Sequence, residues 1–130
     1  MSEPDVLHEA RETMSEAVID GHRAIRSLME ELEAVDWYAQ RVDATDDQDL
    51  KEILAHNRDE EKEHAAMVLE WLRRRDPVLD SHLRQYLFTE GSILAIEEAA
   101  EGGGAADAPA VKDRGTAAGL GIGSLRGEIK

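Results

Sequence analysis

The chain has no cysteine, only three prolines and only five aromatic residues in 130 positions. Without cysteine it has no disulfide framework, no zinc site with thiolate ligands and no thiol nucleophile, and a reducing cytosol suits it. No apolar run approaches the ~20 residues that a transmembrane helix needs. The first five residues are acidic and lack the basic and apolar regions of a signal peptide. The sequence therefore predicts a cytoplasmic protein without a membrane-spanning segment.

Basic side chains are also scarce. Lysine and arginine total 15 against 29 aspartates and glutamates, which gives a formal net charge of −14 at pH 7. The excess lies in residues 1–103, which hold 26 acidic and 11 basic side chains. An acidic body of this kind repels nucleic acid and anionic lipid and attracts cations. We interpret most of these carboxylates as a solvated face.

Strand signals are missing as well, and the pattern that is present is helical. Thr45 to Asp47 can form a capped turn, and Pro77 can end a helix. The expected elements are a long helix from about Val6 to Ala44, a second from about Asp47 to Arg75, a third from Val78 to about Thr89, and a turn or two from Ser92 to Ala100. The predicted fold class is all-α, an antiparallel two-helix hairpin plus a short C-terminal helix.

This hairpin is expected to be a poor monomer. Its apolar side chains lie on more than one flank, and a chain with about 100 orderable residues has little with which to cover them. Residues 102–118 are rich in glycine and alanine and are predicted to be a flexible linker, followed by a short apolar segment at 119–130. We therefore expect self-association, with a four-helix bundle formed only on dimerisation.

The most informative motif is Glu61-x-x-His64 in the second predicted helix. Residues three apart share a helix face, so a carboxylate and an imidazole lie side by side, a ligand pair that suits iron. If the turn centres on Asp46, Glu31 lies as far before it as Glu61 lies after it, so both carboxylates reach the same height. Both interrupt apolar rows, where a carboxylate is costly unless it is paired, protonated or bound to metal. The pattern predicts a metal site.

Di-iron sites in helical bundles take one glutamate from each of two helices and one Glu-x-x-His from each of the other two. One chain supplies half of this set, with Glu31 as the single glutamate and Glu61 and His64 as the motif. A two-fold dimer supplies the whole set, so we expect a di-iron centre between two chains. A lone Glu-x-x-His on a solvated helix is the simpler alternative, and the register with Glu31 disfavours it.

Neighbouring residues have two interpretations each. Glu30 and Glu33 lie on the next flank in a row with Trp37, and they either gather incoming metal or are solvated. Tyr38 lies two turns from Glu31 and either quenches oxidising intermediates or is a packed aromatic side chain. The remaining histidines lack a second ligand at metal-binding spacing and are interpreted as structural: His8, His22, His56 and His82.

Several segments closely resemble the encapsulated ferritins. These segments are Met29–Tyr38, His56–Ala65, Leu69–Arg74 and Tyr86–Glu90, and Gly119–Arg126 resembles the peptide that loads such proteins into an encapsulin shell. The resemblance covers about residues 7–98 and this tail. It implies that residues 1–101 form a ferritin-like domain and that residues 119–130 are an encapsulin targeting peptide.

The resemblance implies a ferroxidase that oxidises Fe²⁺ to Fe³⁺ with dioxygen. Carried over by motif, the di-iron ligands are Glu31, Glu61 and His64 from two chains, and Glu30 and Glu33 form an outer site that admits metal. The resemblance also implies that Trp37 and Tyr38 lie close to the di-iron centre. The resemblance further implies dimers that assemble into a ring-shaped decamer inside an encapsulin nanocompartment, whose shell stores the iron.

Other functions stay open at this point. A non-redox metal-binding protein would use the same ligands, and a helical interaction protein would use only its acidic hairpin and its tail. A hemerythrin-like oxygen carrier is disfavoured, because it needs several histidines at helical spacing and only His64 is well placed. The tail is predicted to bind the shell through Leu120, Ile122 and Leu125. A single tail would bind weakly, and several tails on one assembly would bind tightly through avidity. The alternative is a disordered terminus.

Overall fold

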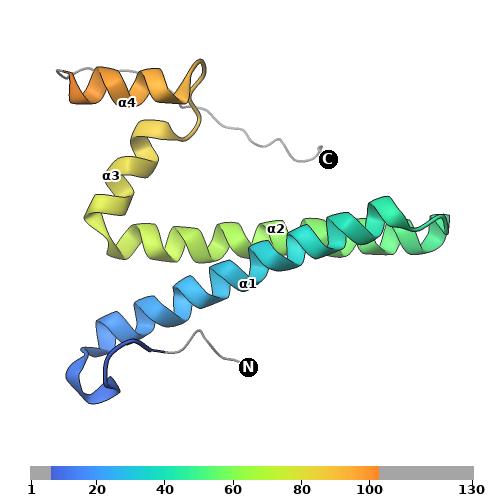
Figure 1. Ribbon diagram of the computed structural model, residues 1–130, viewed down its shortest axis with the longest axis horizontal. Coiled ribbons are helices and arrows are strands. Elements are labelled where there is room, and N and C mark those ends of the chain that lie inside the picture. Colours follow the sequence, from blue (N-terminus) through green and yellow to red (C-terminus); the bar gives the residue numbers. More distant parts are fainter. Residues whose placement is uncertain (1–6, 103–130) are drawn as a thin grey trace. The chain divides into compact units, whose positions relative to one another are not determined.

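The computed structural model describes residues 7–102 of the chain. No strand occurs among them, so the predicted all-α class is confirmed for the described residues. The chain divides into two compact units between Asp76 and Pro77. The elements, in order, are the 3-10 turn η1 (Arg11–Thr13) and the helices α1 (Glu16–Ala44), α2 (Gln48–Arg75), α3 (Pro77–Tyr86) and α4 (Ile93–Glu101) (Figure 1).

The first helix is shorter than the sequence predicted. The expected start near Val6 lies outside the described residues, and α1 begins only at Glu16. Ser15 has extended backbone angles, and its hydroxyl oxygen accepts a hydrogen bond of 3.2 Å from the Val18 N–H. A side chain that caps the first turn gives its free N–H groups a partner outside the helix, so the helix begins at this point. The absence of proline between residues 6 and 15 was not sufficient to extend the helix to the predicted start.

A three-residue turn sets the register of the antiparallel hairpin that α1 and α2 form. Thr45 Oγ1 accepts a hydrogen bond of 3.2 Å from the Asp47 N–H, and Asp47 Oδ1 accepts one of 2.9 Å from the Leu50 N–H. The Lys51 ammonium reaches back across the turn and donates to the Val42 carbonyl oxygen at 2.8 Å. The second helix therefore begins within one residue of its predicted start, and the turn centres where the register argument placed it.

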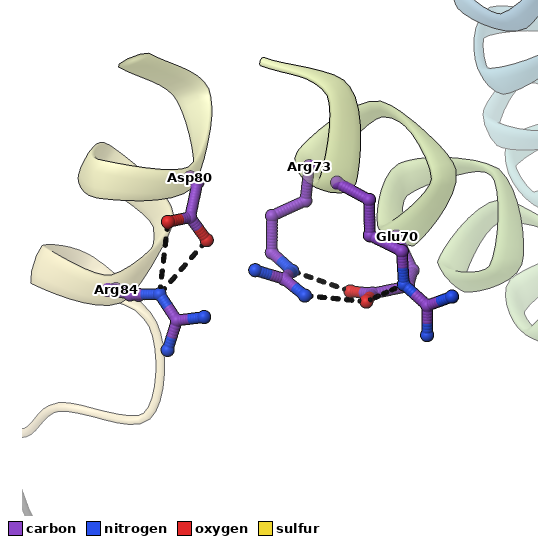
Figure 2. A network of polar contacts seen from close by, with 5 residues as sticks. Glu70, Arg73, Asp80 and Arg84 are labelled. Atoms are coloured by element: carbon purple, nitrogen blue, oxygen red, sulfur yellow. Dashed lines mark hydrogen bonds and ion pairs between the residues drawn. The ribbon is translucent and has the colours of Figure 1, made fainter. Parts of the chain in front are cut away.

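The last turn of α2 is held by arginines that surround one carboxylate, as Figure 2 shows for Glu70 and Arg73. Arg73 donates from Nε and Nη2 to the two oxygens of Glu70, and Arg74 Nε donates to Oε2, each at 2.7 Å. These hydrogen bonds lower the pKa of Glu70 to about 2. Arg75 lies over the ring of Trp71, with its guanidinium carbon 3.8 Å from the ring centroid. Three cations also suit the negative end of the helix dipole, and the predicted end of this helix is confirmed.

The second unit begins with α3, whose first residue is Pro77. Proline suits this position because the first N–H groups of a helix have no partner within it. Figure 2 shows Asp80 on this helix, whose two oxygens accept hydrogen bonds of 2.9 and 3.1 Å from Arg84 Nε. The proline that was predicted to end the second helix therefore also starts the third.

The third helix ends at Tyr86, earlier than the predicted end near Thr89. Phe88 adopts a φ of 63°, in the left-handed region where a helix cannot continue. The following helix starts after Ser92, whose hydroxyl oxygen accepts a hydrogen bond of 3.1 Å from the Ala95 N–H. The predicted extra turn or two is thus a capped helix of nine residues.

The hairpin has almost no core of its own. Among the described residues only Ile19 and Ala65 are buried, and large apolar side chains such as Leu32 on α1 and Ile53 on α2 are about half exposed. Two helices can offer each other only one face, so the remaining apolar area of a single chain stays in water. This exposure supports the predicted self-association. None of the helices in the described part of the chain is long and apolar enough to cross a membrane.

The described residues end at Gly102, the C-cap of α4. The predicted linker beyond it and the predicted targeting segment, with Leu120, Ile122 and Leu125, lie outside the described residues. Their roles remain predictions.

Replacing Asp47 with alanine is expected to lower the free energy of unfolding by about 1 kcal/mol, because the change removes the side chain that caps α2. Urea unfolding followed by helical circular dichroism, at one protein concentration and in chelator, measures the difference. Asp46→Ala is the matched control, since Asp46 is the neighbouring carboxylate of the turn and is not the N-cap. Equal losses in the two variants would contradict the capping role.

Candidate metal centre

The hairpin brings Glu31 on α1 together with Glu61 and His64 on α2. The turn between the helices centres on residue 46, and the two glutamates are equally far from it in sequence. Glu61 and His64 are three residues apart on one helix, so their side chains share a face. Register and helical spacing together therefore place two carboxylates and one imidazole at one level of the hairpin.

The three side chains are close enough to hold one ion. His64 Nδ1 lies 3.3 Å from Glu61 Oε1 and 3.6 Å from Glu31 Oε1. One potential ligand atom from each residue lies within 4.8 Å of the other two, and this is the only such cluster of three acidic or histidine residues among the described residues. Metal bonds to nitrogen and oxygen of about 2.0–2.2 Å hold the ligand atoms of one ion at most ~4.4 Å apart. Binding would require shifts of only a few tenths of an ångström.

The two carboxyl groups shift each other's pKa in opposite directions. The pKa of Glu31 is raised, first because its carboxyl group is hydrogen-bonded to Glu61 and then because of burial and the negative charge of Glu61. The pKa of Glu61 is lowered by the same hydrogen bond and by its bond to His64. Two carboxyl groups from different helices thus lie close enough to affect each other's charge, and a cation between them would interact with both.

The imidazole of His64 is held in a negative environment. Partial burial lowers its pKa, but the hydrogen bond to Glu61 and the charges of Glu31, Glu61 and Glu60 outweigh that effect, so the pKa is raised. The raised pKa reports a field that favours positive charge at this position. A divalent cation takes the place of the imidazolium proton with more charge and with directed bonds.

The cluster is open on one side. The side chains of Glu31 and Glu61 are 26% and 24% exposed, whereas that of His64 is 45% exposed. The donor set of two oxygens and one nitrogen suits iron, which accepts imidazole and carboxylate ligands. Three ligands leave coordination positions free for groups that come from outside this chain.

The other predicted site residues do not join this cluster. Glu30 and Glu33 are exposed, and Glu30 Oε2 lies 3.8 Å from Arg26 Nη2 in an ion pair. Trp37 is 49% exposed, and Tyr38 is partly buried with the Arg41 guanidinium carbon 5.4 Å from its ring centroid. Their predicted roles stay predictions.

Two contacts of the hairpin were not expected from the sequence. The ion pair of Arg26 with Glu30 holds one of the carboxylates of the predicted outer site, and its signal is the spacing of four residues along one helix. The hydrogen bond from Lys51 to the Val42 carbonyl oxygen ties the two helices together close to the turn. No spacing rule reveals the second contact, because it joins residues on different helices.

The chain is similar to several known proteins. The sequence profile of the EncFtn-like family matches residues 6–90. The chain is 61% identical to an "Encapsulated ferritin-like protein" of Rhodospirillum rubrum, over 93% of this chain and 88% of that protein. It is 42% identical to the "Encapsulin nanocompartment cargo protein EncC" of Myxococcus xanthus, over 80% and 83% of the two chains. Among solved structures, protein ne0167 of Nitrosomonas europaea matches with a TM-score of 0.66 and 61% identity, covering 67% of this chain and 96% of that one.

The affinity of the cluster for Zn²⁺, a redox-inert substitute for Fe²⁺, is expected to rise with pH. Below the raised pKa of His64, which lies above the ordinary 6.5, the imidazolium repels the cation, and above it the neutral ring binds. Isothermal titration calorimetry at several pH values measures the profile. His64→Gln should remove this pH dependence, whereas His56→Gln, at a histidine paired with Glu60 on the same helix, should keep it. A profile unchanged in His64→Gln would contradict the assignment.

Proposed function

The chain belongs to the EncFtn-like family, and we propose that it is a ferroxidase that oxidises Fe²⁺ to Fe³⁺ with dioxygen. The proposed reaction takes place at a di-iron centre between two chains, and the product iron is passed on for storage inside an encapsulin nanocompartment. The observation that carries the proposal is the cluster of Glu31, Glu61 and His64 on an open hairpin. It is half of a di-iron ligand set on half of a four-helix bundle.

The second half of the site is proposed to come from a second copy of the chain. The exposure of His64 supports a contact on this side of the hairpin, and the half-exposed apolar residues of both helices support self-association in general. An isologous contact brings the same three ligands from each chain, so a pair of chains supplies four carboxylates and two imidazoles. Dimers joined in this way are proposed to build the ring-shaped decamer that the sequence resemblance implies.

Each residue of the cluster has a distinct part in the proposed reaction, in which iron is the substrate. The carboxylates bring two Fe²⁺ ions together, and their negative charge favours the Fe³⁺ product over the Fe²⁺ reactant. Each Fe²⁺ gives one electron to dioxygen. Both glutamates must be ionised and His64 must be neutral to bind iron.

The surrounding residues are proposed to serve the same reaction. Glu30 and Glu33 are exposed carboxylates that would attract Fe²⁺ from solution towards the centre. The ion pair of Arg26 with Glu30 is long at 3.8 Å and the Glu30 side chain is exposed, so an incoming divalent cation can displace it. Trp37 and Tyr38 are proposed to lie near the completed site, where an aromatic ring can supply an electron to an oxidising intermediate.

The proposed storage role rests on the relatives. The names of two of them describe encapsulation or encapsulin cargo. The match to the Rhodospirillum rubrum protein covers 93% of the chain, which leaves only about nine residues outside it, so it extends past residue 118 into the predicted targeting segment. We propose that residues 119–130 bind the shell and place the protein in the lumen of a cytoplasmic encapsulin.

A non-redox metal-binding protein is the second candidate, because the same three ligands hold a cation whether or not it is oxidised. The two functions differ in the fate of Fe²⁺ in air. If the chain is a ferroxidase, stopped-flow absorbance after aerobic mixing with Fe²⁺ detects Fe³⁺ within the time of one turnover. If the chain only binds the metal, Fe³⁺ forms at the slow uncatalysed rate.

Alanine at Glu31 or at His64 is expected to abolish nearly all ferroxidase activity, because each substitution removes two ligands from a two-fold site. The measurement is the initial rate of Fe³⁺ absorbance, with native mass spectrometry to count irons per pair of chains. His56→Ala is the matched control, since His56 pairs with Glu60 on the same helix and lies outside the cluster. Retention of most of the rate in both cluster variants would refute the proposed site.

Deletion of residues 119–130 is expected to abolish co-purification with a co-expressed encapsulin shell and to leave ferroxidase activity unchanged. The physical reason is that the apolar side chains of Leu120, Ile122 and Leu125 bind the shell while the hairpin carries the chemistry. Gel analysis of purified shells gives the first readout and the Fe³⁺ absorbance the second. A deletion variant that still loads into shells rules out this segment as the targeting peptide.

A further inference from the structure

Large apolar side chains are exposed where α3 is connected to α4, at the turn that Figure 1 shows between these helices. Four of them lie between residues 87 and 94, and we call them the α3–α4 patch: Leu87, Phe88, Ile93 and Leu94. Their exposed fractions are 41%, 95%, 64% and 69% in that order. The patch lies in the second compact unit of the chain and shares no residue with the candidate metal centre.

Phe88 is the most unusual member of the patch. Its φ of 63° lies in the left-handed region, which a bulky residue rarely adopts because its Cβ crowds the backbone. This position after a helix is usually glycine or asparagine. Phe88 nevertheless presents its ring to water. A strained backbone and a hydrated aromatic ring are both unfavourable in the chain alone, and both fit an anchor for a binding partner.

The surroundings of the patch are acidic. Between residues 87 and 101 the chain has four glutamates and no lysine or arginine. Two of them act on the end of α3, because the pKa of Tyr86 is raised, first by its partial burial and then by the negative charges of Glu97 and Glu101. Two copies of this surface would bring like charges into contact, and these repel. The charge therefore favours an occupant that is both apolar and basic.

The C-terminal segment of the same chain, outside the described residues, has this chemistry. Residues 119–130 contain four large apolar side chains, two cations and one carboxylate: Leu120, Ile122, Leu125 and Ile129, then Arg126 and Lys130, then Glu128. The segment thus offers as many large apolar side chains as the patch does, and its net charge is opposite to that of the surface around the patch. Opposite charges attract, and added salt weakens the attraction.

The chain is long enough for this segment to return to the patch. Residues 103–119 separate Gly102, at the end of α4, from Leu120. A glycine-rich chain of that length has a root-mean-square end-to-end distance of roughly 20–25 Å, whereas α4 is about 14 Å long. The segment can therefore reach the start of α4 without full extension. Tethering also gives it an effective concentration of about a millimolar, so even a weak contact is populated.

We propose that the α3–α4 patch is a docking site for residues 119–130 of the same chain. The apolar side chains of the segment cover Phe88, Ile93 and Leu94, and its cations pair with the glutamates of α4. Under the proposed function the same segment binds the encapsulin shell. The consequence for shell loading rests on that function, whereas the contact itself does not.

Docking on the chain competes with shell binding. The apparent affinity of a segment that is free only part of the time falls in proportion to its free fraction. A single shell subunit offers one site and competes poorly, whereas an assembling shell offers many sites to an assembly of chains and binds it through avidity. The patch therefore delays loading until shell subunits assemble.

Disulfide trapping tests the contact in the full-length chain, which has no native cysteine. In dilute protein under mild oxidation, Ile93→Cys/Leu125→Cys should form an intramolecular disulfide about tenfold faster than Val78→Cys/Leu125→Cys, because docking brings only the first pair together. Val78 is the matched control, since it lies on α3 outside the patch and is 66% exposed against 64% for Ile93. Its longer loop accounts for a difference of only about twofold.

Non-reducing gels and peptide mass spectrometry measure the two rates. A ratio near that set by loop length, or disulfides that form only between chains, overturns the proposal. Adding Arg126→Glu to the first pair should slow its cross-linking about threefold at low salt, because the change puts a carboxylate among the glutamates of α4. An unchanged rate contradicts the part that charge plays in the docking.

Shell binding tests the consequence. Phe88→Asn should tighten binding of the full-length chain to immobilised, unassembled shell subunits about threefold, because a weaker docked state leaves more of the segment free. Asparagine tolerates the left-handed backbone, and circular dichroism checks that helix content is unchanged. Val78→Asn is the matched control and should bind as the unsubstituted chain does. Unchanged or weaker binding by Phe88→Asn overturns the proposed competition. If no variant binds the shell, the proposed targeting role fails, and the disulfide rates still decide whether the segment docks.

Discussion

Two helices cannot surround their own apolar side chains, and most other properties of this chain depend on that constraint. Each helix offers one face to its neighbour, and among the described residues only Ile19 and Ala65 are buried as a result. The rest of the apolar area stays half exposed unless other chains cover it. Capping at Ser15, Asp47 and Ser92 determines where the helices begin, but it buries almost nothing. The fold of one chain therefore leaves most of its large apolar side chains without a packing partner among the described residues.

The candidate metal centre is subject to a similar constraint, because one chain supplies only three ligands. Glu31 and Glu61 lie on facing helices, where two negative charges repel each other, and this repulsion contributes to the raised pKa of Glu31. Protonation of one carboxylate would reduce the repulsion. A pair of metal ions and a second set of ligands would relieve it more completely, because a divalent cation brings more charge and directed bonds. Chemistry and assembly are coupled under the proposed function, since the groups that need a cation are also those that need a partner chain.

The sequence predicted the parts of the structure that depend on local rules. The caps at Thr45 to Asp47 and the arginines at 73–75 gave the limits of α2, and the register about Asp46 brought Glu31 to Glu61 and His64. The start of α1 was predicted wrongly, because Ser15 caps the helix well inside a stretch that contains no helix breaker. The end of α3 was also misplaced, since nothing in the composition near Phe88 shows that this residue adopts a positive φ.

By itself, the sequence determined the helical class, the hairpin and the identity of the three clustered residues. Spacing along a helix and distance from a turn can both be counted directly in the sequence. Only the tertiary structure decided which apolar residues stay exposed once the two helices have met. The rows that contain Ile25 and Leu32 read in sequence like any buried row, and the packing of α1 on α2 leaves them uncovered. Burial depends on what lies opposite a side chain, and periodicity does not report that.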